Sequence, residues 1–386
     1  MVTQENLSTQ KNRVHWMDNL RAITVLMVVI YHVGGVYEAT GMWGGFWIVD
    51  DPDTISWVGI AGIFFDLFVM PTMFFIAGYL TPPSLDKKSG WGFVKAKVKR
   101  LLVPWVIAVL TLIPLYRVIF LYSRGLPQEN WLNYFHFTGE NSQNWLWFLP
   151  LLFVFNLIYL TIQKSGVKLP RISLPWMAVI TFVLSLTFSY VMGNIAGFRS
   201  WTHTPILDFE NERLLAHFLF YIAGIMAYRQ KVFEKLPKKK TLYLVANSLS
   251  WLPVTAHIFL RIWPIIAPGF SITPIYRLLW FSSFHLSSLV MVYVMVESFR
   301  FYLNKTGKLW DLLNRNSFGV YIIHVIVIGV FGTLLLFTGL PAVVKWILLV
   351  LTSSIGSNLI ISLYRTMRNS LDRKRSRTLP QREDAK

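Results

Sequence analysis

The chain has 386 residues, of which 54% are hydrophobic, 16% aromatic and only 15% charged. Soluble domains usually carry about 25% charged residues, so the composition excludes an ordinary soluble domain. The net charge of +18 would favour nucleic-acid binding in a soluble protein. In a membrane protein the basic residues concentrate in cytoplasmic loops, so we expect no nucleic-acid partner. The absence of cysteine excludes disulfides, a thiol nucleophile and a cysteine-ligated metal.

The apolar residues gather in runs of about 20, the length that crosses a bilayer. We expect an all-α polytopic membrane helix bundle of about ten transmembrane helices, with the lipid bilayer as its surroundings. The expected spans are residues 20–37, 55–80, 101–123, 145–163, 174–193, 213–229, 241–264, 276–296, 317–337 and 341–364. Basic and non-basic loops alternate between them, which predicts that both termini are cytoplasmic.

No linker or change of composition divides the chain into domains. We expect a cytoplasmic N-terminal segment over residues 1–18 without a cleavable signal pattern. One transmembrane domain should follow over residues 19–365. Residues 366–386 are expected to form a disordered, basic cytoplasmic tail, solvated or lying on anionic lipid headgroups. No convincing internal repeat is present, which weighs against a transporter built from repeated halves.

The first predicted helix carries two polar residues on nearly one face. Arg21 and His32 are eleven positions apart, which is about 16 Å along a helix. Charged and titratable groups within a membrane are costly and mark functional candidates. Arg21 could instead snorkel to the headgroups, and His32 could be a neutral histidine bonded within the bundle. With a cytoplasmic N-terminus, Arg21 lies at that surface and His32 lies deeper, where an imidazole can exchange a proton near neutral pH.

Other polar residues are expected in or near the bundle. Glu38 follows His32 by about a turn and a half and either orients the imidazole or is simply exposed. Asp66 should face the bundle, paired with a cation or a histidine, and Arg117 is a possible partner. His324 is a further histidine within a span. Two more histidines within spans, His217 and His285, are expected to pack against helix neighbours. Two histidines in outer loops, His136 and His203, could touch an external substrate.

Cations and aromatic residues mark the two mouths of the bundle. Lys97 and Arg100 precede the third span and either signal topology or, with Arg21, hold a phosphorylated ligand. Trp145 and Trp147 open the fourth span and either form an aromatic belt or line a sugar site. Walker, dinucleotide, zincin and nucleophile-elbow signatures are absent, and no metal site is expected.

Five short segments in chain order carry a resemblance to a known family. They are Asp18-Asn-Leu-Arg21-Ala with His32 downstream, Met73-Phe-Phe-Ile-Ala-Gly78-Tyr-Leu, Lys97 with Arg100 and Pro104, Trp145-Leu-Trp147-Phe148-Leu-Pro150, and Ser317-Phe-Gly-Val-Tyr321-Ile-Ile-His324. Together they resemble the motifs of membrane acyltransferase family 3 and lie within about residues 13–365. The chain departs from the family pattern at Ala77, Lys97 and Trp145, where the family has Ser, Arg and His.

The resemblance implies an integral, multi-pass O-acyltransferase of the inner (plasma) membrane, with residues 19–365 as its acyltransferase domain. No permanently bound cofactor is implied. The implied co-substrate is cytoplasmic acyl-CoA, either acetyl-CoA or succinyl-CoA, and the implied acceptor is a hydroxyl of a periplasmic or extracellular glycan. The first two motifs resemble a branch of the family associated with succinylation of periplasmic glucans.

This resemblance assigns roles to the polar residues. His32 would be the general base on the acceptor hydroxyl, or would first take the acyl group itself. The further catalytic candidates, for orienting the imidazole or placing the acceptor, are Glu38, Asp66 and His324. The expected donor-binding residues are Arg21, Lys97 and Arg100. The expected substrate-binding residues are Trp145, Trp147 and Tyr321.

Two other classes of function stay open at this point. A transporter or exporter of a glycan or lipid-linked sugar would use Arg21 and His32 for gating or proton relay. A non-catalytic membrane assembly partner would need neither residue. The sequence leaves open the acyl group, the acceptor and the oligomeric state.

Overall fold

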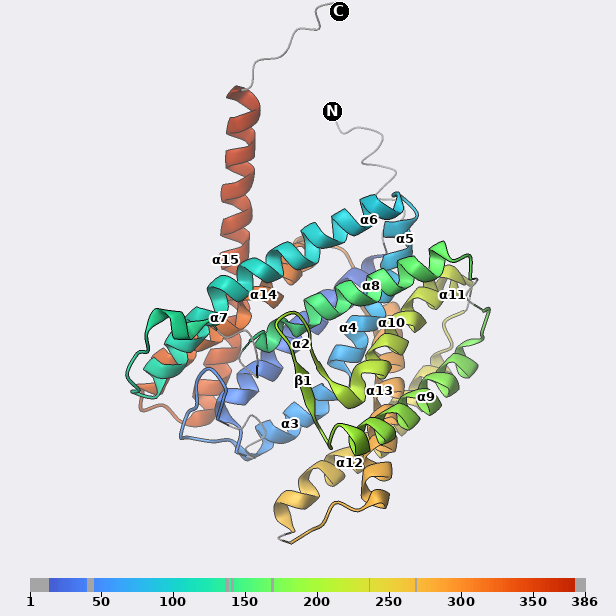
Figure 1. The fold of residues 1–386 in the computed structure, drawn as a ribbon, viewed down its shortest axis with the longest axis horizontal. Coiled ribbons are helices and arrows are strands. Elements are labelled where there is room, and N and C mark those ends of the chain that lie inside the picture. Colours follow the sequence, from blue (N-terminus) through green and yellow to red (C-terminus); the bar gives the residue numbers. More distant parts are fainter. Residues whose placement is uncertain are drawn as a thin grey trace, which may run out of the picture.

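A computed structural model describes residues 14–39, 45–135, 139, 142–167, 170–235, 237–267 and 269–378. Helices dominate these residues, and the only sheet among them is a two-stranded hairpin. The expected all-α bundle is therefore confirmed, and Figure 1 shows its helices packed side by side. The elements in chain order are α2 (His15–Tyr37), α3 (Ser56–Asp66), α4 (Val69–Tyr79), α5 (Thr81–Leu85), α6 (Gly90–Lys97), η1 (Val98–Leu102), α7 (Val103–Ser123), η2 (Trp131–Tyr134), η3 (Asn144–Trp147), α8 (Phe148–Lys164), α9 (Leu174–Ile195), β1 (Trp201–His203), β2 (Asp208–Glu210), η4 (Asn211–Arg213), α10 (Leu214–Arg229), α11 (Val232–Lys235), α12 (Lys240–Ile266), α13 (Pro274–Tyr302), α14 (Lys308–Leu336) and α15 (Ala342–Thr378).

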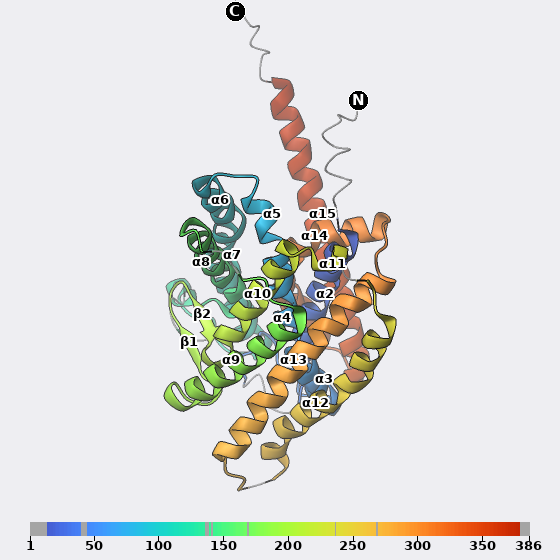
Figure 2. The same ribbon diagram turned by 90° about the vertical axis from the view of Figure 1, so that its right-hand side faces the viewer.

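Every one of the ten predicted spans is helical. Within the described residues, nine helical stretches are long and apolar enough to cross a membrane. The remaining predicted span is α10, which has only 16 residues. The protein is thus a multi-pass membrane protein. The described start of α2 and the end of α15 lie at the same end of the bundle (Figure 2).

The second predicted span is divided into two helices, α3 and α4, near a proline. Pro71 has no N–H and cannot donate to the carbonyl oxygen of Leu67 four residues earlier. The hydroxyl of Ser288 on α13 donates to that oxygen instead, at 2.6 Å. A side chain from a neighbouring helix therefore compensates the break, which falls at Leu67–Phe68 just ahead of the proline.

Helices α4 and α10 approach each other closely through two glycines. A Cβ atom on Gly78 would lie 1.9 Å from the carbonyl oxygen of Tyr221, and one on Gly224 would lie 2.0 Å from that of Phe75. Only glycine leaves room for this contact between backbones. Gly78 belongs to the second family motif, so one reason for that motif is helix packing.

Residues 45–55, which we name the outer segment, fold back into the bundle between α2 and α3. The Nζ atom of Lys345 on α15 holds the segment through Asp51 at 3.1 Å and Asp53 at 3.0 Å. Both Lys345 and Asp51 are buried. Breaking such a pair leaves an uncompensated buried charge, so the segment is firmly attached to the helix bundle.

The last helix continues beyond the expected end of the domain. Helix α15 runs to Thr378, and Figure 1 shows its end projecting away from the other helices. Residues 366–378 are therefore helical, whereas we expected disorder after residue 365. Short-range hydrogen bonds sustain this helix without tertiary packing, because it continues from a span that is already formed. Residues 379–386 lie outside the described part of the chain.

Candidate active site

Two histidines from opposite ends of the sequence meet between α2 and α14. The Nδ1 atom of His32 lies 3.1 Å from Nε2 of His324, and the ring centroids are 4.9 Å apart. His324 is fully buried and His32 is partly exposed. Of the further catalytic candidates, His324 is thus the one that the structure places against His32.

The hydrogen bonds around this pair define the protonation of each ring. Nδ1 of His324 lies 2.7 Å from the carbonyl oxygen of Tyr321, which only accepts, so this nitrogen carries the proton and Nε2 is left as an acceptor. Nδ1 of His32 lies 2.9 Å from the carbonyl oxygen of Val28 and also faces Nε2 of His324. We assign the proton of His32 to Nδ1 on this network. Its Nε2 is then unprotonated, the form that a general base requires.

Trp145 and Tyr321 connect the start of α8 to the histidine pair. The hydroxyl of Tyr321 donates to the carbonyl oxygen of Trp145 at 2.5 Å. Nε1 of Trp145 donates to the carbonyl oxygen of Ile322 at 2.9 Å. Both bonds involve residues of α14 just before His324, so they fix this part of the helix against η3. Trp147 lies apart from them, against Trp201 and His217.

A cavity of about 130 Å³ opens at the end of the bundle where α2 and α14 begin. Three arginines line it, Arg21, Arg100 and Arg315. Its other lining residues include the polar Asn314, Ser317 and Tyr321. Ligand pockets usually measure roughly 300–1,000 Å³, so this cavity is small. Arginines in such a cluster suit phosphate recognition because each presents a planar fork of donors.

The cavity points along the two helices that carry the histidines. Val25 and Tyr321 line it, and they precede His32 and His324 by seven and three residues, or about 10 Å and 5 Å of helix. Arg21 is itself tied to α14, because its Nη2 donates to the carbonyl oxygen of Asn314 at 3.3 Å. The cavity and the histidine pair therefore lie along the same contact between α2 and α14, with buried side chains such as Val28 and Val29 between them.

Local structure explains how the arginines reach the cavity. Nδ2 of Asn19, in the first motif, donates to the carbonyl oxygens of Leu303 and Lys305, at 2.8 and 2.9 Å, and so holds α2 against the loop before α14. Arg100 lies in η1, a π-helical turn between α6 and α7. Such turns are frequent at functional sites. Lys97 does not line this cavity, and its Nζ lies 5.0 Å from the ring centroid of Phe93.

Asp66 and Glu38 lie away from the histidine pair. Asp66 forms a bidentate ion pair with Arg213 at 2.8 and 2.9 Å, so the expectation of a cationic partner is confirmed. The suggested partner Arg117 is wrong, because it pairs with Glu129. Glu38 follows the last residue of α2 and forms a backbone bridge with Ile55 in the outer segment.

Carboxylates at the hairpin end of the bundle have perturbed acidity. Burial raises the pKa of Glu212 to about 7, although its carboxylate accepts a hydrogen bond from the backbone N–H of Arg199. Burial also raises the pKa of Asp208, while the neighbouring His203 opposes the shift. His203 lies 3.4 Å from that carboxylate. Of the loop histidines, His136 lies outside the described residues.

Two residues of this region were missed by the sequence analysis. Arg315 lines the cavity, but in the sequence it reads as one more basic residue near a span end. Trp47 stacks on His32 with ring centroids 5.1 Å apart and planes 17° apart. No sequence signal marks it, because it comes from the outer segment and reaches His32 only through the tertiary fold.

Fold and site together define a multi-pass membrane protein in which two histidines meet between two helices and an arginine-lined cavity lies along the same helices. Comparison with known families identifies it more closely. The chain matches the family described as acyltransferase domain over residues 14–363, and it belongs to that family. The resemblance to membrane acyltransferases is thereby confirmed.

Several curated relatives of the chain carry one and the same name. Proteins named glucans biosynthesis protein C from Salmonella paratyphi A, Salmonella agona and Salmonella enteritidis are each 23% identical to the chain over 230 residues. Each match covers 56% of the chain and 58% of the relative. The chain thus matches less than two thirds of the length of these curated relatives.

Proposed function

We propose that this protein transfers an acyl group from cytoplasmic acyl-CoA to a hydroxyl group of a glycan on the outer side of the inner membrane. The observation that carries the proposal is the alignment of the arginine-lined cavity and the histidine pair along the same two helices, α2 and α14. Membership of the acyltransferase domain family supports the reaction type. The name of the relatives supports a glucan as the acceptor.

The donor would bind with its phosphates at Arg21, Arg100 and Arg315. Charge-assisted hydrogen bonds from guanidinium groups to phosphate are among the strongest in proteins. The flexible arm of the donor would extend along the contact between α2 and α14 and carry the thioester to His32, about 16 Å from Arg21 along α2. The cavity would have to widen to admit the arm, and its apolar lining residues Val25, Met73 and Phe148 suit an uncharged chain.

His32 would act through Nε2 as the general base. It takes the proton of the acceptor hydroxyl while the oxygen attacks the thioester carbonyl carbon. The carbon–sulfur bond then breaks, and the departing thiolate takes the proton back from the imidazolium. The products are an O-acyl glycan and free thiol, so atoms and charge balance. His324 holds the Nδ1–H tautomer of His32 through this cycle, and general-base catalysis contributes about 10²- to 10⁴-fold.

The experiment uses the purified full chain in proteoliposomes, with acetyl-CoA or succinyl-CoA and a glucan acceptor. Thiol release and the mass of the glucan product are measured together. We expect His32→Ala to lower transfer by at least about 100-fold. His257→Gln is the control, because His257 is also a histidine within a span but lies between α12 and α13, where Nδ1 is 3.0 Å from the hydroxyl of Ser283. Full transfer by His32→Ala would refute the proposal, and labelled glycan crossing the bilayer without thiol release would favour a transporter.

A further inference from the structure

Trp47 is the one aromatic residue of the outer segment that lies flat against His32. The 17° angle between the indole and imidazole planes places the π face of the indole on the ring that would carry the proton. Trp47 is only 2% exposed. Tyr31 also contacts the imidazole, at 5.2 Å, but with its edge, and His324 is tilted by 56°.

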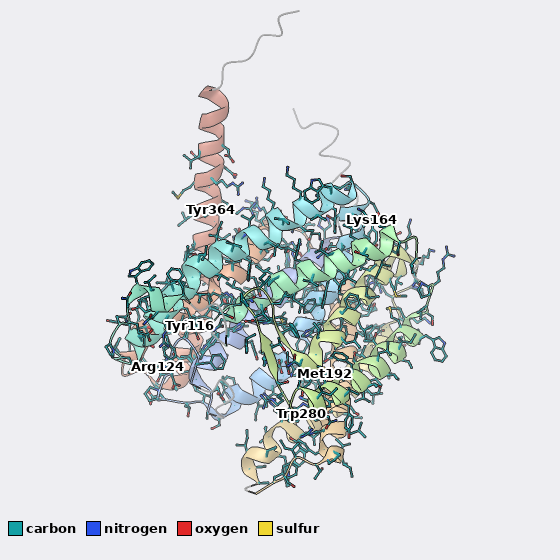
Figure 3. The ribbon with its side chains drawn as sticks, in the orientation of Figure 1. Tyr116, Arg124, Lys164, Met192, Trp280 and Tyr364 are labelled. Carbon is teal, nitrogen blue, oxygen red and sulfur yellow. The ribbon has the colours of Figure 1, made fainter. Side chains whose placement is uncertain are left out.

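Several contacts hold the indole in this position. The guanidinium group of Arg124, the residue directly after α7, donates to the carbonyl oxygen of Trp47 at 2.9 Å. The hydroxyl of Tyr116 on α7 donates to the carbonyl oxygen of Phe46 at 2.5 Å. Both residues are labelled in Figure 3. The backbone on both sides of the indole is therefore fixed by α7 and the residue that follows it.

Gly329 on α14 leaves the space that the outer segment occupies next to Trp47. A Cβ atom on Gly329 would lie 2.4 Å from Cδ1 of Ile48, the residue after Trp47. Without this space Ile48 could not pack into the bundle and the indole would be displaced. Helices α7 and α14 thus both fix the stack on His32.

We infer that Trp47 is a positioning residue that stabilises the imidazolium form of His32 during acyl transfer. The inference rests on the proposed function, in which general-base catalysis makes His32 cationic during transfer. A cation over the face of tryptophan is attracted by the ring quadrupole, most strongly where water is excluded. The neutral imidazole gains much less from the same stack. The contact is therefore stronger when the proton has moved to His32, and such differential binding raises kcat.

The test replaces Trp47 with mono-, di- and trifluorinated tryptophan by site-specific incorporation. Fluorine withdraws charge from the ring face and leaves the shape nearly unchanged, so the variants should fold. We expect kcat to fall stepwise with each fluorine, while KM for the donor stays within about twofold. Trp47→Phe should keep more activity than Trp47→Leu, which should lose roughly 3- to 30-fold in kcat.

The matched control is the same fluorinated series at Trp346, whose ring contacts Trp57 edge-on at 5.1 Å. This series should leave kcat unchanged. If kcat does not change along the fluorinated series at Trp47 while His32→Ala is inactive, the inference is overturned and the proposed function stands. Full transfer by His32→Ala overturns both, because no imidazolium would then form in the reaction.

Discussion

Nε2 of His324 lies 3.1 Å from Nδ1 of His32, although the two residues are 292 positions apart. This contact joins the first and the penultimate of the long helices. The two rings also have different roles in the contact. His324, bonded to its own helix through Tyr321, is fixed in orientation, and Nε2 of His32 is the unprotonated nitrogen in the assigned tautomer.

Replacing His324 tests this division of tasks. His324→Ala removes one of the two acceptors that face Nδ1 of His32 and leaves only the carbonyl oxygen of Val28, so the imidazole is held less firmly in its orientation. We expect kcat to fall about 10- to 100-fold with little change in KM for the donor. Steady-state kinetics with acyl-CoA measure the two constants. A variant that changes only KM would assign His324 to substrate binding instead.

Arg315 should contribute to donor binding more than Lys97 does. Arg315→Gln removes a guanidinium group from the cavity, so the Kd for acyl-CoA should rise about 5- to 30-fold. Lys97→Gln should change it less than twofold or so, because Lys97 does not line the cavity. Titration of the purified variants with acyl-CoA by calorimetry compares them directly. An equal loss of acyl-CoA affinity in both variants would show that Lys97 also contributes to donor binding.

The glycines between α4 and α10 should not tolerate a side chain. Gly224→Ala forces a Cβ atom to within 2.0 Å of a backbone oxygen, so the two helices must separate. We expect a loss of at least about 3 kcal/mol in stability, at the upper end of overpacking effects. Thermal unfolding in detergent measures it. The control is Gly339→Ala, where an added Cβ meets nothing within 4 Å. Equal melting temperatures for Gly224→Ala and Gly339→Ala would contradict the close approach of α4 and α10.

Glu212 should make stability depend on pH. Its pKa of about 7 exceeds the usual 4.5, so between these values the folded state binds a proton that the unfolded state has released. Stability should therefore fall as the pH rises through this window and level off above it. Glu212→Gln keeps the neutral form, so it should melt higher than the wild type at about pH 8 and no higher at about pH 4.5. Glu234→Gln, at an exposed and weak ion pair, should show no such difference.

The helices could be predicted because each apolar run has the length of a membrane span. The break between α3 and α4 could be placed only roughly, since it depends on Ser288 from α13 as well as on Pro71. The helical extension of α15 was missed because its basic composition resembles that of a disordered tail. The partner of Asp66 was predicted wrongly, because Arg213 lies 147 positions away in the sequence and only the tertiary fold brings it to Asp66.

For the candidate site, residues on predicted helices were easier to find than residues in loops. Arg21, His32 and His324 stand out because polar groups inside apolar runs are costly. Their mutual contact depends on how α2 packs against α14, which no sequence pattern reports. Trp47 could not be found at all, since a tryptophan in an outer loop resembles any residue of an interfacial belt.

The short length of α10 has a consequence for the bilayer itself. Sixteen residues cover about 24 Å, some 6 Å less than a typical hydrocarbon core. Such hydrophobic mismatch is relieved by local thinning of the lipid or by water reaching the helix end. The hairpin and η4, which precede α10, would then lie recessed below the lipid surface on their side of the membrane. A solute on that side would have less hydrocarbon to cross beside α10 than beside a helix that spans the full core.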